Sequence, residues 1–268
     1  FVWTDGARPH QVVTDVVEIP WRILDACEDD VEYLDRRQGF VMDQAPLMRF
    51  SVIRLGLQRV RFVWTYHHLL MDGWCLPIVL REVAALYRSL STTGVAAKLP
   101  TPRPYADYIA WLDAQDPVPR DGYWTDLLRG FTEPTPLPFA RTGNGVAGTQ
   151  DAARRLHFTS ALSRSLETLA RREHVSLSGL LQALWAVLLG RYSGKSDVVF
   201  GLTIAGRPPS LAGVEDMVGL FIHTIPVRAR VAPGQTIGTL AAVLTAQHYE
   251  REPFANTALR RIQEWSDV

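Results

Sequence analysis

The spacing of apolar residues in the first third of the chain predicts a mixture of strands and helices. Valines within residues 11–19 alternate loosely with polar residues, as in a strand, and the charged stretch 29–37 favours a helix. Residues 48–55 and 59–67 resemble two strands joined by only three residues, which predicts an antiparallel hairpin. Beyond Gly73 the apolar side chains return at helical spacing, so a helix is expected to begin there.

A proline-rich stretch follows this first part of the chain. Eight prolines lie between residues 99 and 144, and they interrupt two short aromatic helices predicted at 105–112 and 123–128. The aromatic content is too high for a solvated linker. We therefore expect a crossing segment between two halves of similar mixed composition, with the joint near residues 113–150.

The second half is predicted to repeat the mixture of strands and helices. Thr159 or Ser160 is expected to cap one helix, and Ser176 is expected to cap a second helix that lies in the core. The core positions of the second helix are expected to be Leu177, Leu180, Leu181, Leu184 and Leu188. Strands are expected at 154–158, 197–204 and 219–231.

Composition limits the class of protein. The 268 residues contain 28 Lys plus Arg and 28 Asp plus Glu, so no net charge draws the chain to nucleic acid or to an anionic membrane. No stretch approaches the roughly 18 consecutive apolar residues of a membrane helix, and the only cysteines are Cys27 and Cys75. We expect a cytoplasmic protein, and the start at Phe1, without Met or a signal-like core, indicates an excised segment.

One short segment concentrates the residue types that carry catalysis. His67, His68, Asp72 and Gly73 lie between a predicted strand and a predicted helix, where loops commonly carry function. Because neighbouring strand residues point to opposite faces, the two imidazoles cannot share one task. We expect one imidazole to face a cavity and the other to brace the loop. Asp72 would orient an imidazole or bind a cation, and Gly73 would give the backbone freedom of a sharp turn.

Other interpretations of the same residues stay open at this point. Two neighbouring histidines beside a capping aspartate are also typical of a packed core. A metal site is a weaker alternative, because adjacent histidines diverge and no Cys or Glu stands at a ligand interval; we expect no metal. Cys75, in the first turn of the predicted helix, is expected to be a small packing residue, although a position after a turn can activate a thiol.

Four segments, taken in order, resemble the condensation domains of nonribosomal peptide synthetases. That family is defined by two histidines, three variable residues and Asp-Gly, which matches His67-His68-Leu69-Leu70-Met71-Asp72-Gly73. Tyr105-Ala106-Asp107-Tyr108 with Trp111 resembles a second motif of the family. Ala205-Gly206-Arg207-Pro208-Pro209 and residues 218–228 resemble two more. Family members are longer, so the resemblance implies that both ends are cut and that the isolated segment is inactive and poorly stable.

The resemblance implies an α/β fold of two lobes related to chloramphenicol acetyltransferase. Each lobe would be a mixed sheet packed with helices, and the two would form a V-shaped pseudo-dimer around a central tunnel. The N-terminal lobe would comprise residues 1–112, the crossing segment 113–150 and the C-terminal lobe 151–268.

The resemblance also implies an acyltransferase that forms an amide. The amine of an acceptor aminoacyl group would attack the carbonyl of a donor acyl or peptidyl group, each held as a thioester on the phosphopantetheine arm of a carrier domain. An upstream donor carrier, a downstream acceptor carrier and an adenylation domain in the same polypeptide are the implied partners. No permanently bound cofactor is expected. Because a thioester is already activated and an α-amine has a pKa of about 8, positioning should dominate catalysis.

Roles for individual residues follow from the same resemblance. His68 is expected to hydrogen-bond the acceptor amine and help remove its proton, while His67 packs and braces the loop. Asp72 would form a structural ion pair, for which we nominate Arg207 as the partner. Further candidates for tunnel or structural positions are Trp74, Arg207, His223 and Thr224.

Departures from the family pattern and rival functions also bear on the interpretation. His223 stands where relatives usually carry Asn, and Cys75 where Ser is frequent. The intact histidine pair argues against the cyclising subfamily, and Trp74-Cys75-Leu76-Pro77 differs from the Ser-Trp-Arg run of epimerisation domains. One rival is a stand-alone acyltransferase of the same fold that acts on a soluble alcohol or amine. The other is a non-catalytic module that recruits a partner enzyme. The sequence does not identify the amino acids that are joined.

Overall fold

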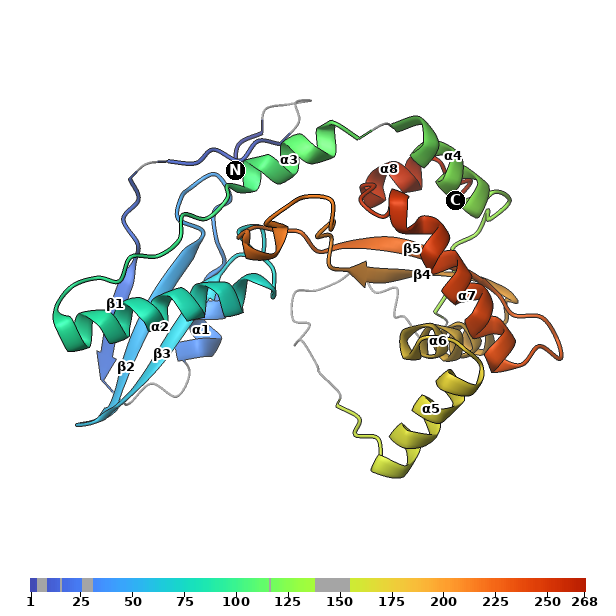
Figure 1. The fold of residues 1–268 in the computed structure, drawn as a ribbon, viewed down its shortest axis with the longest axis horizontal. Helices are drawn as coiled ribbons and strands as arrows, with labels where there is room; N and C mark the ends of the chain where they lie inside the picture. The colour runs from blue at the N-terminus through green and yellow to red at the C-terminus, as the bar shows by residue number, and fades with distance from the viewer. Residues whose placement is uncertain (4–8, 15, 26–30, 116, 138–154) are drawn as a thin grey trace. The chain divides into compact units, whose positions relative to one another are not determined.

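The computed structural model describes residues 1–3, 9–14, 16–25, 31–115, 117–137 and 155–268. These residues fall into two compact units, and both units are discontinuous in sequence. Unit 1 comprises Phe1–Tyr108 and Pro209–Phe221, and unit 2 comprises Ile109–Pro208 and Ile222–Val268. A short piece of chain between two strands of unit 2 therefore belongs to unit 1. Figure 1 traces the order of the elements.

Unit 1 is built on a three-stranded mixed sheet. Strand β1 (Trp21–Asp25) pairs in parallel with β2 (Met48–Gly56), which pairs antiparallel with β3 (Arg59–Tyr66) (Figure 1). Helix α1 (Val31–Gln38) lies between β1 and β2 in the chain, and α2 (Cys75–Thr93) follows β3. The register of the hairpin shifts at Gly56, whose φ of +143° is favourable only for glycine.

The two faces of this sheet differ in chemistry. On one face, Arg49, Ser51 and Ile53 of β2 are buried, and Arg49 stands opposite Thr65 of β3. The other face carries a row of aromatic rings whose centroids are 4.7 to 6.1 Å apart. The row consists of Trp21, Phe50, Phe62, Trp64 and Tyr66. The alternation follows directly from the two-residue period of a strand.

Unit 2 packs helices against a two-stranded antiparallel sheet. The sheet pairs β4 (Asp197–Ile204) with β5 (His223–Arg230) along their full length. Helices α6 (Leu177–Ser193) and α7 (Ile237–Arg251) share the main core with it, which includes Leu180, Ala183 and Leu244. The other elements are α4 (Pro117–Leu128), α5 (Ser160–Arg172), the 3₁₀ turn η2 (Glu252–Phe254) and α8 (Leu259–Glu264).

A second core in unit 2 surrounds one tryptophan. Trp124 of α4 is fully buried against Leu128, Ile225 and Ile262, and its indole Nε1 donates to the carbonyl oxygen of Phe254 at 3.3 Å. The pairing of the polar indole group with a backbone acceptor allows the whole ring to be buried. This cluster joins the proline-rich segment to the end of the chain.

Most of the predicted elements are confirmed. The hairpin, the helix after Gly73 and the strand at 197–204 are present within one or two residues of the predicted bounds. The two aromatic helices are α4 and α3 (Tyr105–Asp113). The hydroxyl of Thr159 accepts from the amide of Leu162 at 3.2 Å, and the hydroxyl of Ser176 accepts from the amide of Gly179 at 2.9 Å, so both caps are confirmed.

Two predicted strands are wrong within the part of the chain that the structure describes. The described residues of 11–19 are exposed coil, because their valines come in adjacent pairs and cannot all face one side of a strand; β1 begins at Trp21 instead. Residues 155–158 are also coil, with Leu156 and Phe158 exposed, and Arg154 lies outside the described residues. A strand without a neighbouring strand would leave its backbone groups unpaired.

The predicted core leucines of α6 need correction as well. Only Leu180 is buried; Leu177, Leu181, Leu184 and Leu188 are between 38% and 42% exposed. The buried face consists of Gly179, Leu180, Gln182, Ala183, Ala186 and Leu189. Gly179, Ala183 and Ala186 leave room on this face where α7 packs closely: a Cβ added at Gly179 would lie 2.4 Å from Oγ1 of Thr245.

Candidate active site

The histidine pair follows β3 directly, and the backbone fixes the first of the two rings. The amide of His67 donates to the carbonyl oxygen of Leu47 at 2.9 Å, and its own carbonyl accepts from the amide of Leu70 at 3.0 Å. The amide of Leu69 donates to His67 Nδ1 at 3.1 Å, so Nδ1 carries a lone pair and the ring proton of a neutral imidazole is on Nε2. The ring of Phe40 contacts the same imidazole edge-on, with centroids 6.2 Å apart.

The second histidine has a different environment. His67 is half-buried among these contacts, whereas His68 is exposed. A loop whose backbone is held on both sides of His68 can present that imidazole in a defined direction. The two rings thus differ in exposure, and the division of tasks expected from the sequence stays a prediction.

Asp72 is the most buried polar group of the motif. Its side chain is fully enclosed, and Oδ1 accepts from the amide of Trp74 at 3.0 Å while Oδ2 accepts from the amide of Phe221 at 2.9 Å. The amide of Asp72 in turn donates to the carbonyl oxygen of Gly219 at 3.2 Å. A buried carboxylate is stabilised by such charge-assisted bonds from backbone amides. Asp72 thus joins the histidine loop to a segment almost 150 residues further along the chain.

Cys75 also connects the histidine loop to Gly219. Its thiol lies 3.2 Å from the carbonyl oxygen of Gly219, 3.5 Å from Oδ1 of Asp72, and accepts from the amide of Gly219 at 3.3 Å. The side chain is completely buried, and burial raises the pKa of the thiol. The interpretation of Cys75 as a packing residue is confirmed, and a thiol of raised pKa is a poor nucleophile.

A tyrosine from the second motif packs on this segment. The hydroxyl of Tyr105 donates to the carbonyl oxygen of Leu220 at 2.5 Å, and the rings of Tyr105 and Tyr108 pack on Phe221 with centroids 5.2 and 4.6 Å away. Gly219 lies directly under the Tyr105 ring, since an added Cβ would be 2.1 Å from its Cδ2. Residues 67–73, 105–108 and 218–221 therefore form one packed cluster in unit 1.

Comparison with known proteins identifies this arrangement. The family model for the condensation domain matches residues 1–268. The chain belongs to the condensation-domain family. A linear gramicidin synthase of Brevibacillus parabrevis is 44% identical over 236 residues, which are 87% of this chain and 5% of that protein. Bacitracin synthase 3 of Bacillus licheniformis is 36% identical over 234 residues, which are 87% of this chain and 4% of that protein. The condensation domain described here thus spans a small fraction of such relatives.

Solved structures share the fold. The first condensation domain of the calcium-dependent antibiotic synthetase, in complex with a substrate analogue, matches with a TM-score of 0.70 and 20% identity over 93% of this chain and 60% of that one. The X-domain from teicoplanin biosynthesis, also solved in complex with OxyB, matches with a TM-score of 0.83 and 21% identity over 96% and 59%. These likenesses confirm the predicted α/β fold of chloramphenicol acetyltransferase type.

The remaining candidate residues of the condensation domain have varied surroundings. Trp74 is 61% exposed and contributes its amide to Asp72. His223 and Thr224 open β5 in unit 2, where His223 Nε2 donates to the carbonyl oxygen of Ala255 at 2.5 Å. Arg207 is half-buried in the loop after β4 in unit 2. Its pairing with Asp72 stays a prediction.

Thr224 lines a cavity within unit 2. The cavity has a volume of about 500 Å³ and is bounded mainly by apolar side chains, including Phe131, Val199 and Ile262. A Cβ at Gly201 would lie 2.7 Å from Cγ2 of Thr224, so glycine at this position leaves room for the threonine methyl group. The sequence identified Thr224 but carried no sign of this cavity.

Gly73 lies in a turn at the end of the histidine motif. It is absent from the residues of positive φ, and a Cβ built at Gly73 would meet no described atom within 4 Å. The turn predicted at Gly73 is present, since the amide of Cys75 donates to the carbonyl oxygen of Asp72 at 3.1 Å, but this turn does not use a positive φ at the glycine. The exposed position instead leaves open space beside the histidine loop.

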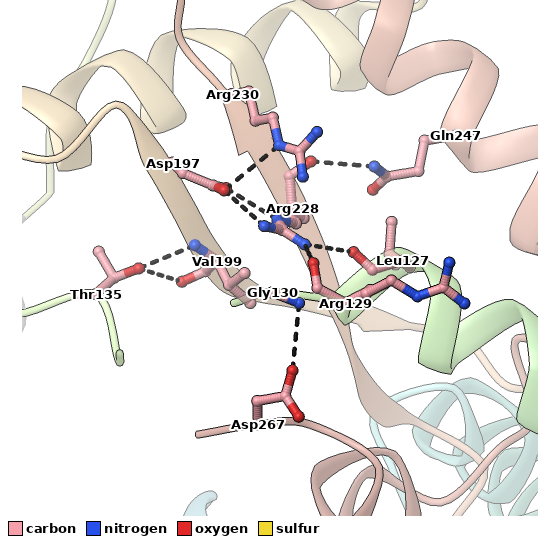
Figure 2. Close-up of polar contacts among 10 residues, drawn as sticks. All are labelled: Leu127, Arg129, Gly130, Thr135, Asp197, Val199, Arg228, Arg230, Gln247 and Asp267. Atoms are coloured by element: carbon pink, nitrogen blue, oxygen red, sulfur yellow. Dashed lines mark hydrogen bonds and ion pairs between the residues drawn. The ribbon is translucent and has the colours of Figure 1, made fainter. Parts of the chain in front are cut away.

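Two ion pairs that each hold a buried arginine are absent from the residues predicted from the sequence. In unit 1, Arg49 Nε lies 2.6 Å from Asp35 Oδ1; in unit 2, Arg228 bonds both carboxylate oxygens of Asp197 at 2.9 and 2.6 Å (Figure 2). A signal for the first pair was present, because Arg49 has the same strand parity as the buried Ser51 and Ile53. A charged residue on a buried strand face requires a partner.

Within the described residues, no group of three or more His, Cys, Asp or Glu side chains could hold a metal ion. Taken singly, none of the helices that the structure describes has the length and apolarity to cross a bilayer; α5 and α6 reach them only as a pair bent by 104°.

Proposed function

We propose that this condensation domain forms an amide bond between two carrier-bound substrates. The donor is an acyl or peptidyl thioester and the acceptor is an aminoacyl thioester, each on the phosphopantetheine arm of a carrier domain. The observation that carries the proposal is the state of the histidine loop: His67 is fixed by backbone contacts, His68 is exposed, and buried Asp72 fastens the loop. Such a site positions one imidazole and leaves it accessible to substrate.

The reaction needs modest help from the protein. The acceptor amine attacks the donor carbonyl carbon, the C–N bond forms, and the C–S bond breaks to release the donor carrier's thiol. His68 hydrogen-bonds the amine and accepts its excess proton, which then passes to the departing sulfur. Proton transfer by a positioned side chain contributes about 10²–10⁴-fold, and alignment of the two thioesters contributes more.

Asp72 has a structural role in this proposal. Its carboxylate holds the amides of Trp74 and Phe221 and lies too deep to meet substrate. We propose that it also pairs with Arg207, since an arginine fork can satisfy carboxylate lone pairs left by the two amides. Trp74, Gly73, His223 and Thr224 are proposed to shape the path of the substrates.

The partners are proposed from the chemistry of the substrates. Thioesters on pantetheine arms require an upstream donor carrier and a downstream acceptor carrier, and an adenylation domain in the same polypeptide would load the amino acid. A relative such as the linear gramicidin synthase, of which this chain matches 5%, has ample length for such domains. The domain would need no cofactor of its own, and we place the reaction in the cytoplasm.

A second candidate function is recruitment of a partner enzyme without catalysis. The TM-score of 0.83 with the X-domain, a protein solved in complex with OxyB, favours it. The intact pair His67 and His68 favours catalysis, because a recruiting surface needs neither imidazole.

The decisive experiment uses the full-length domain with loaded donor and acceptor carriers. Intact-protein mass spectrometry should show the acyl group moving to the acceptor carrier. His68→Ala should slow this transfer at least about tenfold without lowering the melting temperature, whereas His67→Ala should lower the melting temperature. His157→Ala, at an exposed histidine of unit 2, is the matched control and should change neither.

Each contrary result has a clear meaning. Wild-type transfer by folded His68→Ala would remove His68 from the reaction. A wild-type domain that transfers nothing to any acceptor carrier or soluble amine would favour recruitment, and transfer only to a soluble alcohol or amine would identify a stand-alone acyltransferase.

A further inference from the structure

A buried cluster lies directly behind His67. The guanidinium of Arg49 binds Asp35 Oδ1 through Nε at 2.6 Å, the carbonyl oxygen of Gly39 through Nη1 at 2.8 Å, and the carbonyl oxygen of Asp35 through Nη2. The guanidinium carbon also lies 4.3 Å from the centroid of the Phe40 ring. Phe40 is the ring that contacts His67 edge-on. A continuous series of contacts therefore runs from α1 to the histidine motif.

We propose that Asp35, Arg49 and Phe40 are positioning residues that orient the histidine motif. The ion pair fixes Phe40, Phe40 fixes the His67 ring, and the fixed His67 sets the backbone from which His68 projects. The inference rests on the proposed function in one respect only, namely that His68 acts on the acceptor amine.

The charges of this cluster favour a rigid arrangement. Only 8% of the Arg49 side chain and 3% of the Asp35 side chain are exposed, so breaking the pair would leave an uncompensated charge in the interior. Burial alone would raise the pKa of Asp35, but hydrogen bonds from Arg49 and Thr65 and the charge of Arg49 hold it below its ordinary value. Thr65 faces Arg49 across the hairpin and lies two residues before His67. Arg49 is thus linked to the histidine motif in two ways, through the Phe40 ring and through Thr65.

The state of the His67 ring gives a readout that is independent of catalysis. Because the amide of Leu69 donates to Nδ1, the ring is held as the Nε2–H tautomer, with the edge of the ring against Phe40. If the cluster orients His67, a substitution in the cluster should allow the ring proton to exchange between Nδ1 and Nε2. A cluster that only stabilises the fold would leave the tautomer unchanged.

Unit 2 contains a matched control for the buried arginine. Arg228 binds the carboxylate of Asp197, the carbonyl oxygens of Leu127 and Arg129 at 3.0 and 2.8 Å, and the Phe131 ring at 5.4 Å (Figure 2). Only 6% of its side chain is exposed. As around Arg49, a buried guanidinium binds a carboxylate, two backbone carbonyl oxygens and a phenylalanine ring, although Asp197 is 34% exposed; none of these residues is part of the histidine motif.

The experiment compares Arg49→Met, Phe40→Leu and Arg228→Met in the full-length domain. Selective ¹⁵N-histidine labelling reports the His67 tautomer by NMR, with His67→Ala for assignment. Single-turnover acyl transfer between loaded carriers, measured from pH 6 to 9 at varied acceptor concentration, reports the rate and the KM. Thermal unfolding reports stability.

The expected results separate positioning from stability. Arg49→Met and Phe40→Leu should lose the fixed tautomer signal and slow the transfer at saturation about tenfold, with the acceptor KM changed by less than about twofold. Arg228→Met should lower the melting temperature as much as Arg49→Met while the tautomer and the normalised rate stay unchanged. Arg49→Lys, which keeps the charge but not the fork, should recover only part of the rate.

Several outcomes would overturn the proposal. A retained His67 tautomer in folded Phe40→Leu would do so, as would equal rate losses in Arg49→Met and Arg228→Met after correction for the folded fraction. Phe40→Leu removes the ring but keeps an apolar side chain and both charges, so it decides the question if Arg49→Met fails to fold. A tautomer that changes in a domain without any transfer activity would sustain the positioning of His67 and refute the proposed function alone.

Discussion

The carboxylate of Asp72 accepts a hydrogen bond at 2.9 Å from the amide of Phe221, a residue 149 positions further along the chain. The aspartate of the histidine motif therefore contacts a second of the segments that resemble family motifs. Cys75 and Tyr105 reinforce the contact through Gly219 and Leu220. Asp72, Cys75 and Tyr105 therefore all contact residues 219–221, next to the loop that carries His68.

Asp72→Asn should lower the free energy of unfolding by about 3–5 kcal/mol, because one amide side chain cannot accept from the amides of both Trp74 and Phe221 without turning its NH₂ toward a donor. Denaturant unfolding of the full-length domain measures the change. Asp216→Asn, in an exposed pair with Arg81, is the control and should cost no more than about 1 kcal/mol. An Asp72→Asn protein of unchanged stability and reduced turnover would instead favour direct catalysis.

Gly219→Ala should destabilise the domain by about 1–3 kcal/mol or more, since the new methyl group would overlap the Tyr105 ring. Gly73→Ala should leave stability unchanged, because nothing described lies within 4 Å of its Cβ. Paired thermal melts test both statements. A normal melting temperature for Gly219→Ala would show that Tyr105 can move aside at little cost, and a loss of transfer in stable Gly73→Ala would show that substrate uses the open space.

Cys75 should resist alkylation in the folded domain. The thiol is completely buried and burial raises its pKa, so little thiolate is available to a reagent such as iodoacetamide. In a Cys27→Ser background, mass spectrometry should show labelling of Cys75 only after denaturant is added. Rapid labelling of the native protein at neutral pH would mean that the junction of Asp72, Cys75 and Gly219 opens readily.

Asp197 should contribute stability that depends on pH. Its hydrogen bond with Arg228 lowers its pKa in the folded state despite partial burial, and Arg230 adds to the shift. A carboxylate with a depressed folded pKa stabilises above the unfolded value of about 3.9, and this contribution is lost as pH falls through the folded pKa. The stability gap between wild type and Asp197→Asn should therefore be wide at pH 7 and narrow near pH 3. A constant gap would exclude the charge as its source.

The sequence was most informative where local pattern and chemistry agree. Alternation of β-branched and aromatic residues predicts β2, β3 and β4, and single side chains predict one cap at Ser176 and another at Thr159 or Ser160, of which the structure uses Thr159. The histidine motif was recognised from seven residues. Its division into a braced His67 and an exposed His68 follows strand alternation, and the assignment of their tasks stays a prediction.

Failures of prediction have a common cause in contacts made far along the chain. The strand expected at 219–231 begins only at His223, because the backbone of Gly219 and Phe221 pairs with Cys75 and Asp72 and is not available to β4. The leucines of α6 looked like a core stripe, but the close packing of α7 selects the small residues beside them. No local pattern indicates which of two apolar helix faces has a neighbour.

The course of the chain between the two units limits how condensation domains can be recombined. Chain passes from one unit to the other after Tyr108, after Pro208 and again after Phe221. A chimeric synthetase joined at residue 108 would therefore take residues 209–221 from one parent and the histidine loop from the other. Residues 209–221 of one parent would then have to fit the Asp72 carboxylate, the Cys75 thiol and the Tyr105 ring of the other. Grafts that transfer residues 209–221 together with the histidine loop and Tyr105 should therefore fold more reliably than a chimera with a single crossover.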